Sequence, residues 1–177
     1  MTQSARKRFH WGLVVFYITL LYSTLPLAPW LYSRIAGLSA GSFGIYLNVL
    51  ILSIGISLSG YLPLVRIEKR PWPYLWLIGI AIGYGLFLAT VELPSERIHF
   101  LEYGVLGWLL MNVLSHDYNS HALLLVAALM IVILGFVDEG IQWVLPNRFF
   151  ELRDVGMNTA GGLLGILLMR FVIPAKM

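Results

Sequence analysis

The 177-residue sequence contains no cysteine and few charged side chains. The absence of cysteine excludes disulfide bonds, thiolate nucleophiles and cysteine-ligated metal sites. Asp, Glu, Lys and Arg make up 12% of the chain, about half of the roughly 25% that is usual in soluble proteins. Because 59% of the residues are hydrophobic, a soluble domain of this size would lack the interior volume to bury them. The composition therefore predicts an integral membrane protein.

The net charge of +3 does not indicate a nucleic-acid partner. The basic residues stand in short clusters between apolar runs, and in membrane proteins this pattern reports orientation. The sequence also lacks an HExxH zinc motif, a recognised nucleophile motif and a glycine-rich phosphate loop. Composition and motifs alone therefore leave open whether the protein is an enzyme.

Six apolar segments reach or approach the length of about 20 residues that a helix needs to cross a bilayer. They are too long and too continuous to be strands, so we predict an all-α, polytopic transmembrane bundle. No room remains for a soluble domain. The predicted spans are residues 9–27, 43–64, 73–91, 98–115, 121–144 and 155–173.

The distribution of Lys and Arg predicts the orientation of these spans. Eight of the twelve basic residues fall on the side of both termini, and seven of the nine acidic residues fall on the opposite side. We therefore predict a multi-pass protein of the plasma (inner) membrane with both termini in the cytoplasm. The acidic side would then be extracytoplasmic.

The chain divides by its motifs at about residue 95. Residues 1–94 hold three apolar segments without a recognisable motif, whereas residues 95–177 hold three apolar segments and the polar cluster described next. Two glycine pairs have the small-xxx-small spacing that lets helices approach closely in lipid: Gly79 with Gly83, and Gly161 with Gly165.

Polar side chains gather at the predicted outer ends of the last three segments. Ionisable groups within spans are costly and usually face one another or a cavity. The sequence therefore predicts one outward-opening polar pocket. Its candidate residues are His99, Glu102 and Tyr103 in the fourth segment, Asp138, Glu139 and Gln142 in the fifth, Arg148 in the connection, and Asp154 and Asn158 in the sixth.

Each of these residues also has a structural interpretation. Asp154 could cap the sixth helix and favour its N-terminal dipole. Tyr103 could belong to an interfacial aromatic belt, and His99 could bond to a loop. Arg148 could pair with an acidic neighbour in a network that ties the fifth helix to the sixth.

At these residues the sequence resembles the VanZ-like family of integral membrane proteins, which is named for a teicoplanin-resistance protein. One family motif, His-x-x-x-Tyr, is matched by residues 99–103. A second begins with Asp-Glu-x-x-Gln, matched by residues 138–142, and continues through Pro146 and Arg148 to Asp-Val-x-x-Asn-x-x-Gly at residues 154–161. The family usually has Gly where this chain has Asn147, a residue that also tolerates positive φ.

The resemblance implies a bacterial membrane protein with an outward polar site, linked to cell-envelope lipids or glycans. A role in glycopeptide resistance or in envelope homeostasis would fit such a protein. The expected partners are therefore membrane lipids, and the candidate ligand is a phospholipid or a polyprenyl-linked envelope precursor. The sequence indicates neither the reaction, if any, nor the oligomeric state.

For such a ligand we assign candidate roles. His99, Glu139 and Asp154 are the candidate catalytic residues, since an imidazole exchanges protons near neutral pH and a carboxylate could orient it. Arg148 could pair with a phosphate, and a divalent cation such as Mg²⁺ or Mn²⁺ could be held by the carboxylates. The remaining candidate binding residues are Tyr103, Gln142, Asn158, Asp138 and Glu102.

Two other functions stay open. The polar cluster could be a structural network in a non-catalytic, modulatory membrane protein. A small-molecule transporter is less favoured, because the polar residues lie at one depth and no inverted repeat is visible.

Overall fold

The computed structural model describes residues 2–173 except for 28, 32, 35–41, 65–69, 91–93 and 147. All the regular structure in these residues is helical, which confirms the all-α prediction. The described helices are α1 (Gln3–Thr24), α3 (Phe43–Leu64), α4 (Pro71–Thr90), α5 (Pro94–Leu114), α6 (Ser120–Val144) and α7 (Leu152–Leu167), which continues as a π-helix (Leu168–Val172).

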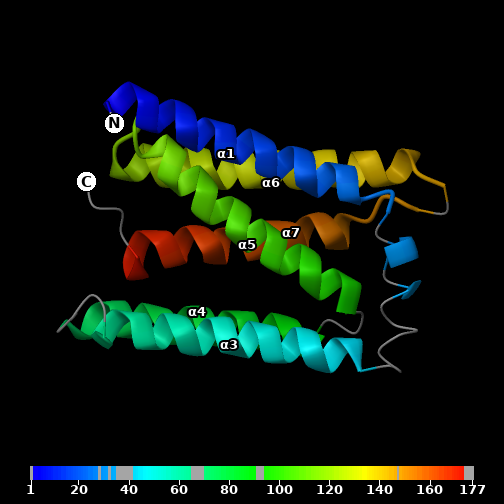
Figure 1. The fold of residues 1–177 in the computed structure, drawn as a ribbon, viewed down its shortest axis with the longest axis horizontal. Helices are drawn as coiled ribbons and strands as arrows, with labels where there is room; N and C mark the ends of the chain where they lie inside the picture. Colours follow the sequence, from blue (N-terminus) through cyan, green and yellow to red (C-terminus); the bar gives the residue numbers. More distant parts are fainter. Residues whose placement is uncertain are drawn as a thin grey trace.

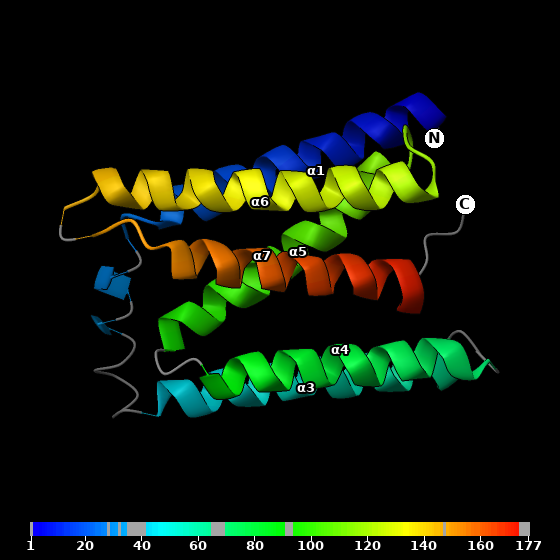
Figure 2. The same cartoon turned by 180° about the vertical axis from the view of Figure 1, so that it is seen from behind.

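Successive long helices run in opposite directions (Figure 1). The beginning of α1 and the end of the π-helix therefore lie at the same end of the bundle, on the left of Figure 1. The beginning of α5, the end of α6 and the beginning of α7 lie at the opposite end. Figure 2 shows from behind that α3 and α4 form a pair beside α7, away from α1 and α6.

Local signals explain where several helices begin and end. Thr2 and Asn119 precede α1 and α6 and accept hydrogen bonds from Ala5 N and Ala122 N, both over 3.3 Å, as N-cap residues do. Leu145 ends α6 in an extended conformation, which is expected of a residue before a proline.

α7 begins earlier than the sequence suggested. Its first residue is Leu152, and Glu151 occupies the N-cap position without a side-chain capping bond. Asp154 is the acidic residue of the first turn, where its negative charge interacts favourably with the helix dipole. The interpretation of Asp154 as the cap is therefore wrong, although its dipole role is retained.

Glycines set the distance between α5 and α7, the two helices that pack most extensively on each other. A Cβ atom at Gly161 would collide with the carbonyl group of Phe100, and one at Gly165 with the carbonyl group of Gly104. The close packing predicted for Gly161 and Gly165 is confirmed. In the other predicted pair, a Cβ at Gly83 would lie 3.2 Å from the side chain of Leu164 in α7, whereas one at Gly79 meets nothing among the described residues within 4 Å.

The core lies between α1, α5, α6 and α7, whereas large apolar side chains cover outer faces. Leu125, Leu129 and Ile133 follow one another at helical spacing along α6 and are exposed. By length and composition, Ser120–Val144 and Leu152–Val172 are apolar enough to cross a membrane, and Pro71–Phe87 is a shorter apolar helix. These findings concern the described residues only.

Several charged residues that set the predicted orientation lie outside the described residues. They are Arg66, Glu68, Lys69, Glu92 and Lys176.

Polar contacts tie α1 to the C-terminal helices. The hydroxyl group of Tyr17 donates to the carbonyl oxygen of Glu102 over 3.0 Å, and that of Tyr22 donates to the carbonyl oxygen of Leu134 over 2.9 Å. At the opposite end of α1, Lys7 Nζ lies 2.5 Å from Asp117 Oδ1. α1 therefore helps to position the helices that carry the candidate site.

Candidate functional site

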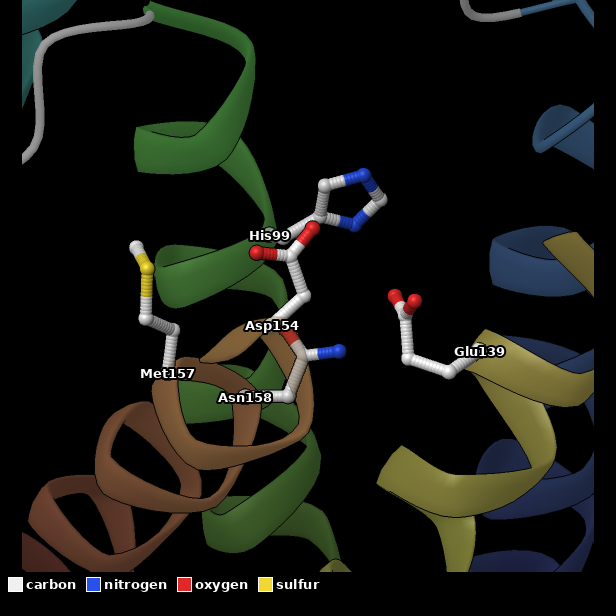
Figure 3. A pocket seen from close by; sticks show the side chains of 5 residues that line it. All are labelled: His99, Glu139, Asp154, Met157 and Asn158. Carbon is white, nitrogen blue, oxygen red and sulfur yellow. The ribbon is translucent and has the colours of Figure 1, made fainter. Parts of the chain in front are cut away.

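A small cavity lies where the beginnings of α5 and α7 meet the end of α6. His99 of α5, Glu139 of α6 and three residues of α7, Asp154, Met157 and Asn158, line it (Figure 3). Its volume of about 10 Å³ is close to the minimum that holds one water molecule. The structure thus brings the three candidate catalytic residues, and Asn158, to one place.

Helical spacing explains how α7 contributes to this cavity. Asp154 and Asn158 are four residues apart, so their side chains lie on one face of the helix. The close approach at Gly161 brings this face against the first turns of α5, where His99 lies. In Figure 3 the carboxyl group of Glu139 faces this space from α6.

Behind the cavity, amide and carboxylate groups link α6 to α7. Asn158 Nδ2 donates to Asp138 Oδ2 over 3.0 Å. Gln142 Nε2 donates to Glu139 Oε1 over 2.8 Å and more weakly to Asp138 Oδ2 over 3.4 Å. The backbone N–H of Glu151 donates to Glu139 Oε2 over 3.1 Å. All four of these polar side chains on α6 and α7 are buried.

Arg148 joins this network through an amide. Its Nη2 donates to Gln142 Oε1, and among the described residues it forms no ion pair. The expected pairing of Arg148 with an acidic neighbour is therefore wrong in this conformation. The predicted network between the fifth and sixth segments does exist, but Gln142 and Asn158 make its links.

His99 and Glu102 lie together on α5, as their spacing predicts. His99 Nδ1 is 3.2 Å from Glu102 Oε2, and the two side chains are 21% and 30% exposed. The contact does not count as a hydrogen bond by geometry, but it is an ion pair when the imidazole is protonated. His99 therefore faces Glu102 through Nδ1.

Tyr103 supports the site from behind and is not among the residues that line the cavity. It is fully buried, and its hydroxyl group donates to the carbonyl oxygen of Leu134 over 2.9 Å. An interfacial aromatic-belt position is therefore wrong for Tyr103. The same carbonyl accepts the bond from Tyr22 of α1, a contribution that sequence reasoning missed. A buried tyrosine hydroxyl group needs a hydrogen-bond partner. A tyrosine within an apolar span was therefore the only sign in the sequence that Tyr22 makes such a bond.

Three polar atoms of the candidate residues are buried without a hydrogen-bond partner in the described structure: His99 Nδ1, Asp138 Oδ1 and Asp154 Oδ1. An unsatisfied buried polar group costs roughly 1–3 kcal/mol, and such groups are uncommon in folded proteins. Two of the three belong to residues that line the cavity. Chemically, the site offers carboxylate acceptors and an imidazole that can hold or release a proton.

The carboxylates do not converge as metal ligands. In the part of the chain that the structure describes, no three His, Asp or Glu side chains are close enough to hold a metal ion. The Mg²⁺ or Mn²⁺ ion that the acidic residues suggested therefore has no ligand set in this conformation.

The comparison with protein families agrees with the motif residues. Residues 95–173 match the model of the family described as VanZ/LLP1. No curated protein matches the chain, and no solved structure does. All nine candidate site residues fall within the matched range. The part of the chain that builds the site, residues 95–173, is therefore VanZ-like.

Proposed function

We propose that this protein is a six-span protein of the bacterial inner membrane whose polar site binds the headgroup of a membrane lipid or a lipid-linked cell-envelope precursor. The site would face the extracytoplasmic side. The VanZ-like match over residues 95–173 supports a membrane protein. The apolar outer faces of the helices support lipid as its surroundings.

The location of the cavity supports a headgroup as the ligand. It lies at one end of the bundle, between the first turns of α5 and α7 and the last turns of α6. In a protein whose helices span the membrane, this depth is near the headgroup layer. Positive-inside orientation would place that layer on the extracytoplasmic side.

The unpartnered polar atoms carry the proposal. A network that served only to hold helices together would gain stability by pairing Asp138 Oδ1 and Asp154 Oδ1, yet both atoms are buried without hydrogen-bond partners among the described residues. Functional sites often keep such unsatisfied groups for a ligand. A bound headgroup would provide the missing partners.

Arg148 is the candidate contact for a lipid phosphate. A guanidinium group carries five donors in a planar fork that suits phosphate, and the bond to Gln142 uses Nη2. Arg148 follows the turn at Pro146, between the end of α6 and the beginning of α7. It therefore lies beside the cavity without lining it.

A second candidate function is a non-catalytic, modulatory role in the envelope, which includes a role in glycopeptide resistance. The bonds of Asp138, Glu139, Gln142 and Asn158 favour it, because they fasten α6 to α7 as a structural network would. A transporter has less support, since the candidate polar residues belong to the beginnings of α5 and α7, the end of α6 and the connection between them, and these parts lie at one end of the bundle (Figure 1).

Native mass spectrometry of the detergent-solubilised protein would test lipid binding. The probes are phosphatidylglycerol, phosphatidylethanolamine and a polyprenyl phosphate, and the variant is His99→Gln. His121→Gln is the control, because His121 is exposed at the beginning of α6, at the other end of the bundle. We expect at least one lipid to bind, and His99→Gln, but not the control, to weaken it. Unchanged lipid binding with a lower melting temperature would favour the structural alternative.

Expression of the protein in a teicoplanin-sensitive host would test the resistance role separately. The measurement is the teicoplanin concentration that stops growth, with the His99→Gln variant as the comparison. A shift that the variant abolishes would link the site to resistance.

A further inference from the structure

The lining of the cavity is acidic. Two of its five residues, Glu139 and Asp154, carry carboxyl groups, and none of the five is Lys or Arg. Arg148 reaches the site through Gln142, which in turn donates to Glu139. An ionised phosphate inside the cavity would therefore face two carboxylates, which is unfavourable at close range, and the His99 imidazole of the lining already faces Glu102.

The hydrogen bonds missing in the site require a donor. Asp154 Oδ1, which is buried on a residue of the lining, can only accept a hydrogen bond when ionised, and so can the buried Asp138 Oδ1 behind it. A phosphate brings acceptor oxygens, whereas a primary ammonium group brings three donors and a positive charge. Both the charge and the hydrogen-bonding pattern thus favour an ammonium group.

The size of the cavity limits which ammonium group can enter. About 10 Å³ corresponds to roughly one water-sized group. An –NH₃⁺ group is about as large as a water molecule, but a trimethylammonium group carries three additional methyl groups and offers no N–H donor. The cavity therefore discriminates by size as well as by hydrogen bonding.

We propose that the cavity takes the primary ammonium group of an aminoalkyl phosphate ester, with the phosphate outside the cavity on the Arg148 side. This inference rests on the proposed function and specifies its ligand. Asp154 and Glu139 supply the negative charge, and Asp154 Oδ1 accepts a hydrogen bond from the ammonium group. The chain Glu139–Gln142–Arg148 connects the acidic cavity to the cationic group that meets the phosphate.

The test compares four probes on the full chain in nanodiscs or detergent, with binding measured by native mass spectrometry. Phosphatidylethanolamine carries the primary ammonium group, phosphatidylcholine carries the trimethylated one, and phosphatidylglycerol carries none. Glycerophosphoethanolamine carries the ammonium and phosphate groups without acyl chains. Asp154→Asn removes one of the two carboxylate charges of the lining, and Asp117→Asn removes a charge from an exposed position at the opposite end of the bundle.

We expect phosphatidylethanolamine to bind at least about tenfold more tightly than phosphatidylcholine, since a charge-assisted hydrogen bond is at stake. Asp154→Asn should remove most of this preference, and Asp117→Asn should keep it. If Asp154→Asn does not insert into the membrane, the ratios of the parent protein decide alone. Equal binding of phosphatidylethanolamine and phosphatidylglycerol, or of phosphatidylethanolamine and phosphatidylcholine, overturns the ammonium inference but keeps lipid binding.

Two further results separate this inference from the proposed function. If glycerophosphoethanolamine binds as tightly as the lipid, the ammonium inference holds and a water-soluble ester replaces the lipid as ligand. If none of the four probes binds, the ammonium inference is overturned and lipid binding loses its support.

Discussion

Asn158 of α7 donates a hydrogen bond of 3.0 Å to Asp138 of α6, twenty residues earlier in the chain. Both residues are almost completely buried, at 2% and 0% exposure. A carboxylate in such a place depends on its donors, because burial removes its hydration. This bond is therefore the most direct polar connection between the two helices that carry the acidic part of the site.

Asn158→Ala should consequently lower the stability of the protein by roughly 1–3 kcal/mol, because it leaves Asp138 Oδ2 with only the long bond from Gln142. Thermal unfolding in detergent would measure the loss as a lower melting temperature. Asn112→Ala is the matched control, because Asn112 Nδ2 bonds to the carbonyl oxygen of Trp108 in its own helix. Equal losses for the two variants would contradict a special role for the Asp138–Asn158 bond.

A second prediction concerns the glycines between α5 and α7. Gly165→Ala places a methyl group against the backbone of Gly104, so the helices must separate, at a cost of about 1–3 kcal/mol. Gly79→Ala in α4 meets nothing among the described residues within 4 Å and should be neutral or stabilising by up to about 1 kcal/mol. Melting temperatures of the two variants give the comparison, and a Gly165→Ala protein as stable as the parent would refute the close packing.

The sequence predicts the helices better than it predicts their polar contacts. An apolar run of about 20 residues indicates a membrane-spanning helix by its length alone. The predicted segments 98–115 and 121–144 differ by only a few residues from α5 and α6. The predicted start of the sixth segment at residue 155 misses Leu152. The sequence placed Leu152 and Arg153 before the helix, but both residues belong to the first turn of α7.

The candidate site could be located from the sequence, but its bonding could not. The helical spacing of Asp154 and Asn158, and the motif order, place these groups at one end of three helices, as observed. The charge of Arg148 suggested an acidic partner. Its position between α6 and α7 instead lets it donate a hydrogen bond to the amide oxygen of Gln142. The shared acceptor of Tyr22 and Tyr103 is a backbone carbonyl, and no sequence pattern reveals which carbonyl a buried hydroxyl will reach.

Substitution of Arg148 provides the third prediction. Arg148→Lys keeps the charge but loses the planar fork that binds phosphate with two bonds. We expect it to reduce binding of phosphate-bearing lipids by about tenfold, in line with the loss of a charge-assisted bond, while the protein still inserts. Arg8→Lys, on α1 at the opposite end of the bundle, is the control. If Arg148 only marks orientation, both variants will bind lipid as the parent does.

The last prediction tests the orientation of the bundle in the membrane. Because the chain contains no cysteine, a single introduced cysteine reports one position without a background. Ser4 on α1 and Glu151 before α7 are both exposed and lie at opposite ends of the bundle. If the basic side is cytoplasmic, a membrane-impermeant maleimide added to whole cells should label Glu151→Cys. Ser4→Cys should react only after the membrane is opened. Because the helices alternate in direction, these two positions are sufficient to orient the bundle.

Labelling of Ser4→Cys in intact cells would show the opposite topology, with the cavity on the cytoplasmic side. The candidate ligand would then have to come from the inner leaflet or from the cytoplasm.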